Sequence, residues 1–216
     1  MTVGETRCGF VAILGAPNAG KSTLVNQLVG QKISIVSRKV QTTRMRVRGI
    51  VMEGDAQIVL VDTPGIFAPR RRLDRAMVDA AWGSVSDADA ILLLVDAPSL
   101  IADPQGHAAQ DTQRIVDGLK AQTKRAFLAL NKIDEIPRDK LLPLAARLNE
   151  SGVFDETFMI SGLKGDGMDV LRRALARKMP LGPHAYPPDQ AADLPQRLLA
   201  AEIVREHLYN RLHDEL

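Results

Sequence analysis

Short apolar runs alternate along the chain with segments in which apolar residues recur every three or four positions. Runs that are apolar at every position are typical of strands covered on both faces, as in a parallel sheet. Five such runs predict strands at residues 10–14, 58–61, 91–95, 126–130 and 157–160. Residues 46–52 begin by alternating Arg, Val and Arg instead, which predicts an edge strand with one solvent-facing side.

The segments between these runs carry helical spacing. Apolar residues fall at intervals of three and four from Leu73 to Ala81 and from Met168 to Met179, as on the buried face of an amphipathic helix. Strands that alternate with helices along a chain pack as a sheet between two helical layers. We therefore predict an α/β fold with a mostly parallel six-stranded sheet, one antiparallel edge strand and helices on both faces.

Residues 180–195 differ in composition from what precedes them. They hold five prolines, which predicts a linker. We predict a first domain over residues 1–180, then a linker and a helix over residues 181–216. That helix either docks on the first domain or begins a second one. Its apolar residues are expected on one stripe, at Ala201, Val204, Leu208 and Leu212.

The composition narrows the range of functions. The 216 residues are 45% hydrophobic, enough for one sizeable core, and carry a net charge of only +2. Aromatic residues make up 4%, which argues against a surface that stacks single-stranded nucleic acid. The arginines at residues 44–48 and 70–72 are expected to form solvated loop faces rather than a phosphate-binding patch. No apolar run approaches the roughly 20 residues that span a bilayer.

The strongest chemical signal follows the first predicted strand. Residues 15–22 match the pattern G-x-x-x-x-G-K-[ST] between a strand and a helix, the setting in which this pattern binds nucleotide phosphates. The backbone N–H groups of such a loop, together with the helix N-terminus, hold the anion. Lys21 would reach the β- and γ-phosphates, and the Ser22 hydroxyl would bind Mg²⁺. The nucleotide-binding residues predicted here are Gly15, Ala16, Pro17, Asn18, Ala19, Gly20, Lys21, Ser22 and Thr23.

The second predicted strand ends in the turn Asp62-Thr63-Pro64-Gly65, followed by Ile66. An aspartate at that edge of a sheet can hold Mg²⁺ through water. Gly65 has no side chain, so its N–H can approach a γ-phosphate. An ordinary strand-ending turn is the alternative, because Asp, Pro and Gly all form turns. The spacing from the phosphate loop favours the metal site.

The sequence Asn131-Lys132-Ile133-Asp134 ends the strand predicted at residues 126–130. The Asp134 carboxylate can accept two hydrogen bonds from guanine, and adenine lacks both donors. Asn131 would brace the loop and meet the base edge, and the Lys132 stem would lie over the ring.

A short turn follows the last predicted strand. A backbone N–H there could meet the guanine O6, and a plain strand-to-helix turn is an equal interpretation. The residues of this turn are Ser161, Gly162 and Leu163.

Two adjacent threonines, Thr42 and Thr43, precede the alternating strand. One hydroxyl there would complete the Mg²⁺ shell when a γ-phosphate is present, and we favour Thr43 as the metal ligand. Residues 31–40 would then form a loop that orders with GTP and loosens after hydrolysis. A polar loop with strand-forming threonines is the alternative.

Together, the ordered motifs resemble those of the translation-factor-related GTPases. Residues 30–44 closely resemble the switch I region of the Era family, and residues 186–189 and 201–206 resemble its stretch between two domains. The resemblance implies a P-loop NTPase G domain that binds GTP or GDP with Mg²⁺ and hydrolyses GTP. It also implies a role in maturation of the small ribosomal subunit and a C-terminal KH domain that binds 16S-type rRNA. That domain would lie beyond Leu216, so we expect a shortened chain.

The resemblance also bears on hydrolysis. Ras-like proteins orient the attacking water with a glutamine after the glycine of this turn, and Ile66 stands in that place, so slow turnover is expected. Related GTPases with an asparagine in the phosphate loop use K⁺, which would make Asn18 a K⁺ ligand. A local turn at Asn18 is the alternative. The residues expected to act in catalysis are Lys21, Thr43, Asn18 and Gly65.

Guanine nucleotide is the expected partner of this chain, and small-subunit rRNA and the small ribosomal subunit are those of the full-length family member. A monomer in the cytoplasm is expected, with peripheral association at the inner face of the plasma membrane as a further expectation. Two alternatives remain open. One is a guanine-nucleotide-binding docking module with little catalysis, and the other is a related tRNA-modification GTPase.

Overall fold

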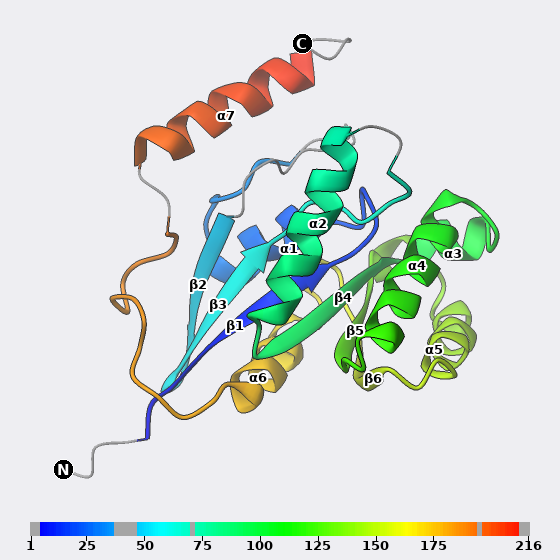
Figure 1. Cartoon of the computed structure of the whole chain (residues 1–216), viewed down its shortest axis with the longest axis horizontal. Helices are drawn as coiled ribbons and strands as arrows, with labels where there is room; N and C mark the ends of the chain where they lie inside the picture. The colour runs from blue at the N-terminus through cyan, green and yellow to red at the C-terminus, as the bar shows by residue number, and fades with distance from the viewer. Residues whose placement is uncertain (1–4, 37–46, 70–71, 194–195, 212–216) are drawn as a thin grey trace.

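One sheet runs through the computed structural model, with helices on both faces (Figure 1). The structure describes residues 5–36, 47–69, 72–193 and 196–211. Within them the strands lie in the order β2-β3-β1-β4-β5-β6, and every neighbouring pair is parallel except β2 with β3. The strands are β1 (Arg7–Leu14), β2 (Val47–Glu53), β3 (Ala56–Asp62), β4 (Ala90–Asp96), β5 (Ala126–Asn131) and β6 (Phe154–Met159).

The predicted α/β fold is confirmed, because helices cover the sheet on both faces. In β4, Leu92 and Leu94 belong to one buried cluster, while Ile91 and Leu93 belong to the other. Helices α1 and α6 pack against the first face, and α2, α3, α4 and α5 against the second. The helices are α1 (Lys21–Val29), α2 (Arg72–Ser86), α3 (Ala97–Ala102), α4 (His107–Ala121), α5 (Leu141–Asn149), α6 (Met168–Lys178) and α7 (Gln196–Arg211), with 3-10 turns η1 (Ile133–Glu135) and η2 (Arg138–Lys140).

The predicted linker follows the sheet edge closely, and we call residues 181–193 the strap. The N–H of Gly182 donates to the carbonyl of Thr6 at 3.0 Å, where the strap begins. Near its end, the N–H of Ile50 in β2 donates to the carbonyl of Ala191 at 2.8 Å. The orange trace of Figure 1 runs beside β2 accordingly. The strap therefore continues the hydrogen bonding of the sheet past its edge strand.

A buried glutamine anchors the strap. Gln57 lies in β3 and is completely buried. Its Oε1 accepts the N–H groups of Ala185 at 2.8 Å and Tyr186 at 2.9 Å, and its Nε2 donates to the carbonyl of Tyr186 at 2.8 Å. A buried amide must be hydrogen-bonded to be tolerated, so Gln57 and the strap depend on each other.

Arg48 was expected on a solvated loop face, but it also holds the strap. Its guanidinium donates to the Tyr186 hydroxyl at 3.1 Å and to the Asp193 carboxylate at 3.2 Å. The hydrogen bond with Tyr186 is the main cause that raises the pKa of Arg48. The other arginines of that cluster, Arg44 and Arg46, lie outside the described residues.

The tail helix α7 differs from its predicted pattern. Ala201 is exposed and Val204 is 58% exposed, so the described half of the predicted apolar stripe faces solvent. Leu212 and the side chain of Leu208 lie outside the described part. Among the side chains of α7 that the structure describes, the buried one is instead Glu206, at 5% exposure.

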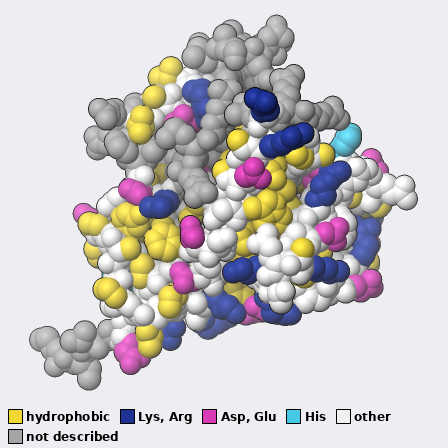
Figure 2. Space-filling model, in the orientation of Figure 1, with side chains coloured by type: hydrophobic (Ala, Val, Ile, Leu, Met, Phe, Trp, Pro, Cys, Tyr) yellow, Lys and Arg dark blue, Asp and Glu magenta, His cyan; other side chains and the backbone are white. Residues whose placement is uncertain are grey.

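Charges of both signs are mixed on the face seen in Figure 2. Lys and Arg side chains are scattered among Asp and Glu side chains on the face in Figure 2, without one continuous field of either sign. Among the described residues, none of the helices is both long and apolar enough to cross a bilayer.

We predict that Gln57→Met frees the strap without dissolving the sheet. The substitution removes the acceptor of the Ala185 and Tyr186 N–H groups, and each lost hydrogen bond contributes about 0.5–1.5 kcal/mol to stability. Hydrogen exchange should speed up at these two amides and stay slow at Leu93 in β4. Gln190→Met, which alters a glutamine bonded only within the strap, serves as the control. Unchanged exchange at Ala185 and Tyr186 would show that Gln57 does not anchor the strap.

Candidate functional site

Those predicted site residues that the structure describes follow strands that end at one edge of the sheet. Strands β1, β3, β4 and β5 are mutually parallel, so their carboxyl ends share an edge, and a site of an open α/β sheet forms there. The phosphate-loop motif follows β1, Asp62 closes β3, Asp96 closes β4 and Asn131 closes β5.

Lys21, the first residue of α1, is buried within the loop that precedes it. Its Nζ donates to the carbonyls of Gly15 at 3.1 Å and Ala16 at 2.9 Å, and the residue is 8% exposed. Burial lowers the pKa of Lys21 to about 8, against an opposing effect of Asp62. A cation so poorly solvated is stabilised by an anion brought beside it, which suits the predicted phosphate contact.

The carboxylate of Asp62 sits fully buried between two hydroxyls. Its Oδ2 accepts the Oγ–H of Ser22 at 2.9 Å and that of Ser34 at 2.8 Å. Carboxylate and hydroxyl oxygens are hard ligands of the kind that Mg²⁺ prefers, and Mg²⁺ in such sites takes only one or two protein ligands beside phosphate and water. Ser22 and Asp62 therefore fit the predicted metal. No group of three His, Cys, Asp or Glu side chains that could hold a metal occurs in the described residues.

The turn after Asp62 lies directly on the phosphate loop. The N–H of Ile66 donates to the carbonyl of Gly15 at 3.1 Å. A Cβ on Gly65 would stand 3.0 Å from the backbone nitrogen of Pro17, so a side chain there would press the two loops apart. Ile66 is 2% exposed and packs in the hydrophobic core under α2, α3 and α4. Its side chain therefore points away from solvent, and cannot orient a water as a glutamine would.

Asn131 links the loops on either side of it. Its Nδ2 donates to the carbonyl of Ala19 in the phosphate loop at 2.8 Å, and its Oδ1 accepts the N–H of Gly162 at 2.9 Å. Gly20 makes this approach possible, because a Cβ there would lie 2.5 Å from Nδ2 and the residue has a φ of 96°. Asn131 thus braces the loops, as one of its two predicted roles requires.

Asp134 is held as an anion at the mouth of the site. A hydrogen bond from the Ser161 hydroxyl is the main cause that lowers the pKa of Asp134, and Lys164 contributes with its Nζ 3.6 Å from Oδ2. A carboxylate that stays charged can accept two N–H donors from a guanine. The neighbouring Lys132 donates through its Nζ to the Asp96 carboxylate at 2.5 Å. Leu163, from the turn after β6, is 74% exposed.

The backbone of Asn18 fits a local turn, and its side chain is open to solvent. This residue has a φ of 62°, a left-handed conformation that asparagine tolerates better than most residues. Asn18 is also exposed, so its side chain remains accessible to a ligand. Thr42 and Thr43 lie outside the described residues.

The sequence missed three side chains of this site. Asp96 ends an apolar run as Asp62 and Asn131 do, so the same signal was available for it. Lys164 stands in a turn where nothing in the pattern marks it. Ser34 is a small polar residue between two isoleucines, and only the folded chain reveals that it is 4% exposed and bonded to Asp62.

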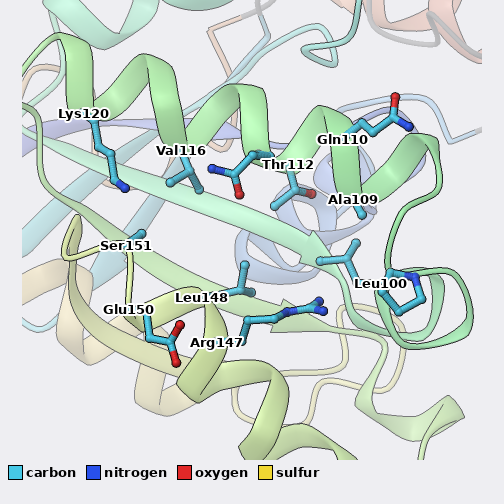
Figure 3. Close-up of a pocket in the computed structure, with 12 residues that line it drawn as sticks. Leu100, Ala109, Gln110, Thr112, Val116, Lys120, Arg147, Leu148, Glu150 and Ser151 are labelled. Carbon is cyan, nitrogen blue, oxygen red and sulfur yellow. The ribbon is translucent and has the colours of Figure 1, made fainter.

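Two cavities flank α4. One of about 650 Å³ borders the phosphate loop at Pro17 and Asn18 and reaches Phe67, next to the Gly65 turn. The other, of about 480 Å³, lies between α4 and α5, with Val116 above it and Leu148 below (Figure 3). None of the predicted site residues lines that second cavity.

Comparisons with known proteins agree with these motifs. Residues 10–132 match the family described as 50S ribosome-binding GTPase. The GTPase Era of Afipia carboxidovorans is 59% identical over 98% of this chain and 66% of its own length. The GTPase Era of Caulobacter vibrioides is 57% identical over 100% of this chain and 70% of its own length.

A solved structure carries the same fold. It contains Era in complex with MgGDPNP and nucleotides 1506–1542 of 16S ribosomal RNA, and matches with a TM-score of 0.87 at 40% identity, over 98% of this chain and 70% of that one. The chain thus spans about two thirds of the length of the relatives it matches. With these matches, the chain belongs to the Era family of GTPases, enzymes that hydrolyse GTP.

Proposed function

We propose that this chain is a GTP-driven switch that acts in assembly of the small ribosomal subunit. It binds GTP with Mg²⁺ at the carboxyl edge of the sheet and changes state on hydrolysis to GDP. The observation that carries the proposal is the Asn131 amide, which joins the phosphate loop to the loops around Asp134. A nucleoside triphosphate is recognised at its base and at its phosphates, which lie a fixed distance apart. The Asn131 amide sets the distance between the loops that would bind these two ends.

Each part of the nucleotide has a matching group. Asp134 and the backbone at Ser161 to Leu163 face the guanine, and the Lys132 stem lies along the base. Backbone N–H groups of the phosphate loop and the Lys21 ammonium hold the phosphates. When bound, Mg²⁺ supplies positive charge to the β- and γ-oxygens, and Ser22, Asp62 and Thr43 are the residues that would hold it. Thr42 is assigned to the nucleotide site beside Thr43.

For hydrolysis, the chain's own contribution is positioning. Lys21 lies where it can offset charge that develops on the transferred phosphoryl group. The Gly65 N–H is free of any side chain that would block the γ-phosphate. Because Ile66 is in the core, no side chain at that position aligns the water, and we propose that a K⁺ ion held by Asn18 supplies further positive charge.

The ribosomal role rests on the Era relatives. One of them was solved with part of 16S ribosomal RNA, and we propose that rRNA recognition belongs to a KH-type domain that follows this chain in the cytoplasmic full-length protein. Residues 1–180 would then be the G domain, and residues 181–216 would lead from it into that domain. The small net charge of this chain supports the division, because tight RNA binding needs concentrated positive charge.

We predict that Asp134→Asn moves nucleotide preference from guanine to xanthine. The amide can donate to the xanthine 2-carbonyl but cannot accept both guanine donors. Loss of a charged hydrogen bond of about 2–3 kcal/mol lowers GDP affinity on the order of 100-fold. Titration with fluorescent GDP and XDP measures both affinities. The parent protein should also release phosphate from GTP with Mg²⁺ but not from ATP. An Asp134→Asn protein that still binds GDP like the parent would rule out this residue as the base reader.

We predict that GTP turnover is faster in KCl than in NaCl at equal ionic strength. Stimulation of at least about 10-fold, or roughly 1.4 kcal/mol of barrier, is expected for one added charge contact. Asn18→Gly should abolish the stimulation, because glycine keeps the positive φ while removing the side-chain carbonyl. Equal rates of the parent in both salts would leave Asn18 as a turn residue alone.

We predict that this chain alone binds the 3′ region of 16S rRNA at least about 100-fold more weakly than a protein extended by the following domain. The reason is the small net charge, since each lost phosphate contact weakens binding and flattens its salt dependence. Fluorescence anisotropy with an RNA of nucleotides 1506–1542, at one fixed salt concentration, gives both affinities. Equally tight binding by the two proteins would assign RNA recognition to the described domain.

A further inference from the structure

A short turn after α1 reaches into the metal site. Ser34 is 4% exposed, and its Oγ donates to Asp62 Oδ2 at 2.8 Å. The same oxygen accepts Ser22 Oγ at 2.9 Å. One carboxylate oxygen is therefore fixed by two hydroxyls from separate segments, and one of these hydroxyls has no part in the phosphate-loop motif.

Asn26 in α1 fixes the position of Ser34. Its Oδ1 accepts the N–H groups of Ile33 and Ser34, each at 2.9 Å, and its Nδ2 donates to the carbonyl of Ser34 at 2.8 Å. Three hydrogen bonds from one side chain leave this turn little freedom. Helix α1 begins at Lys21 of the phosphate-loop motif, so Asn26 fixes the position of the turn relative to that loop.

The tail helix holds the other end of the same turn. Glu206 of α7 accepts the N–H of Val36 at 3.1 Å and forms an ion pair with Lys32. Glu206 is 5% exposed, so its carboxylate is largely shielded from water, while the Lys32 side chain is 49% exposed. The residues between the two anchors form a continuous path from α7 to Asp62, through Val36, Ile35 and Ser34.

We propose that Ser34 is a positioning residue for the Mg²⁺ site, and that Glu206 sets how firmly the turn carrying it is held. This inference rests on the proposed nucleotide function. Mg²⁺ requires near-octahedral ligand geometry, and groups that orient metal-binding carboxylates typically contribute 10–100-fold to metal affinity. The Ser34 hydroxyl keeps Asp62 turned toward Ser22. Through Glu206, the helix α7 then influences how long the nucleotide stays bound.

The test measures release of a fluorescent N-methylanthraniloyl derivative of GDP from the 216-residue chain, in Mg²⁺ and again in EDTA. Ser34→Ala should speed release about 10-fold in Mg²⁺ and leave release in EDTA unchanged. Ser84→Ala is the matched control, because it deletes another buried serine hydroxyl, which donates to the carbonyl of Ala80 within α2. It should leave both rates as in the parent.

Two results would overturn the role of Ser34. Release from Ser34→Ala at the parent rate in Mg²⁺ is one, and equal acceleration in Mg²⁺ and EDTA, which signals a merely structural effect, is the other. Ser34→Cys keeps a donor, a weaker one on a larger atom, and should give an intermediate rate, so the test stands even if the alanine variant folds poorly. A parent that binds no GDP would contradict the proposed function instead.

The link to α7 is tested with Glu206→Ala. This change should accelerate release in Mg²⁺ by a smaller factor, about 3-fold. It removes a single hydrogen bond to the turn, and only part of that loss reaches Asp62. Combined with Ser34→Ala, it should add nothing, because both act on Asp62 through the same turn. Glu202→Ala, on the same helix and bonded to Arg205, is the control. Fully multiplicative effects of the two substitutions would show that α7 acts by another route.

Discussion

The site depends on one buried side-chain amide. Asn131 is 3% exposed and offers a donor on one side and an acceptor on the other. It uses the donor on Ala19 in the phosphate loop and the acceptor on Gly162 in the turn after β6. A planar amide has one geometry, and a buried polar group left unpaired costs about 1–3 kcal/mol. Moving the two loops apart would therefore cost stability.

Around this amide the protein keeps two opposite charges out of water. Lys21 is enclosed by carbonyls, and Asp62 by hydroxyls. The lowered pKa of Lys21 records the cost of its burial. Because the folded pKa of Lys21 lies below its unfolded value, its burial destabilises the fold most at pH values below about 8. The penalty fades as pH rises toward 10.5. Such preorganised charge is what a phosphate site needs, since nothing has to rearrange when charge develops.

Sequence pattern predicted the layers, and it placed several candidate site residues at one edge of the sheet, for physical reasons that can be traced to particular residues. A strand apolar at every position, such as residues 91–95, has to be covered on both faces. Polar residues at the ends of such strands must then gather at one edge, which brought Asp62 and Asn131 together. The helices α3, α4 and α5 were not predicted, and in α4 the buried face includes Asp111 and Thr112, which dilute the apolar spacing. Ser34, the strap and Glu206 depend on contacts between distant segments, which local pattern does not carry.

The strap changes how the sheet meets its surroundings. An edge strand exposes a row of unpaired N–H and C=O groups that can template pairing with another chain. Here two backbone groups of β2 are already bonded to the strap: the Ile50 N–H donates to Ala191, and the Arg48 carbonyl accepts from Asp193. Backbone bonding places few demands on side-chain identity, so this protection can persist while the strap sequence varies, provided that an acceptor such as Gln57 remains. The prolines that make the segment resemble a linker also keep it from adding a full strand. The β2 edge of the sheet is therefore covered by a segment on which another chain can hardly pair.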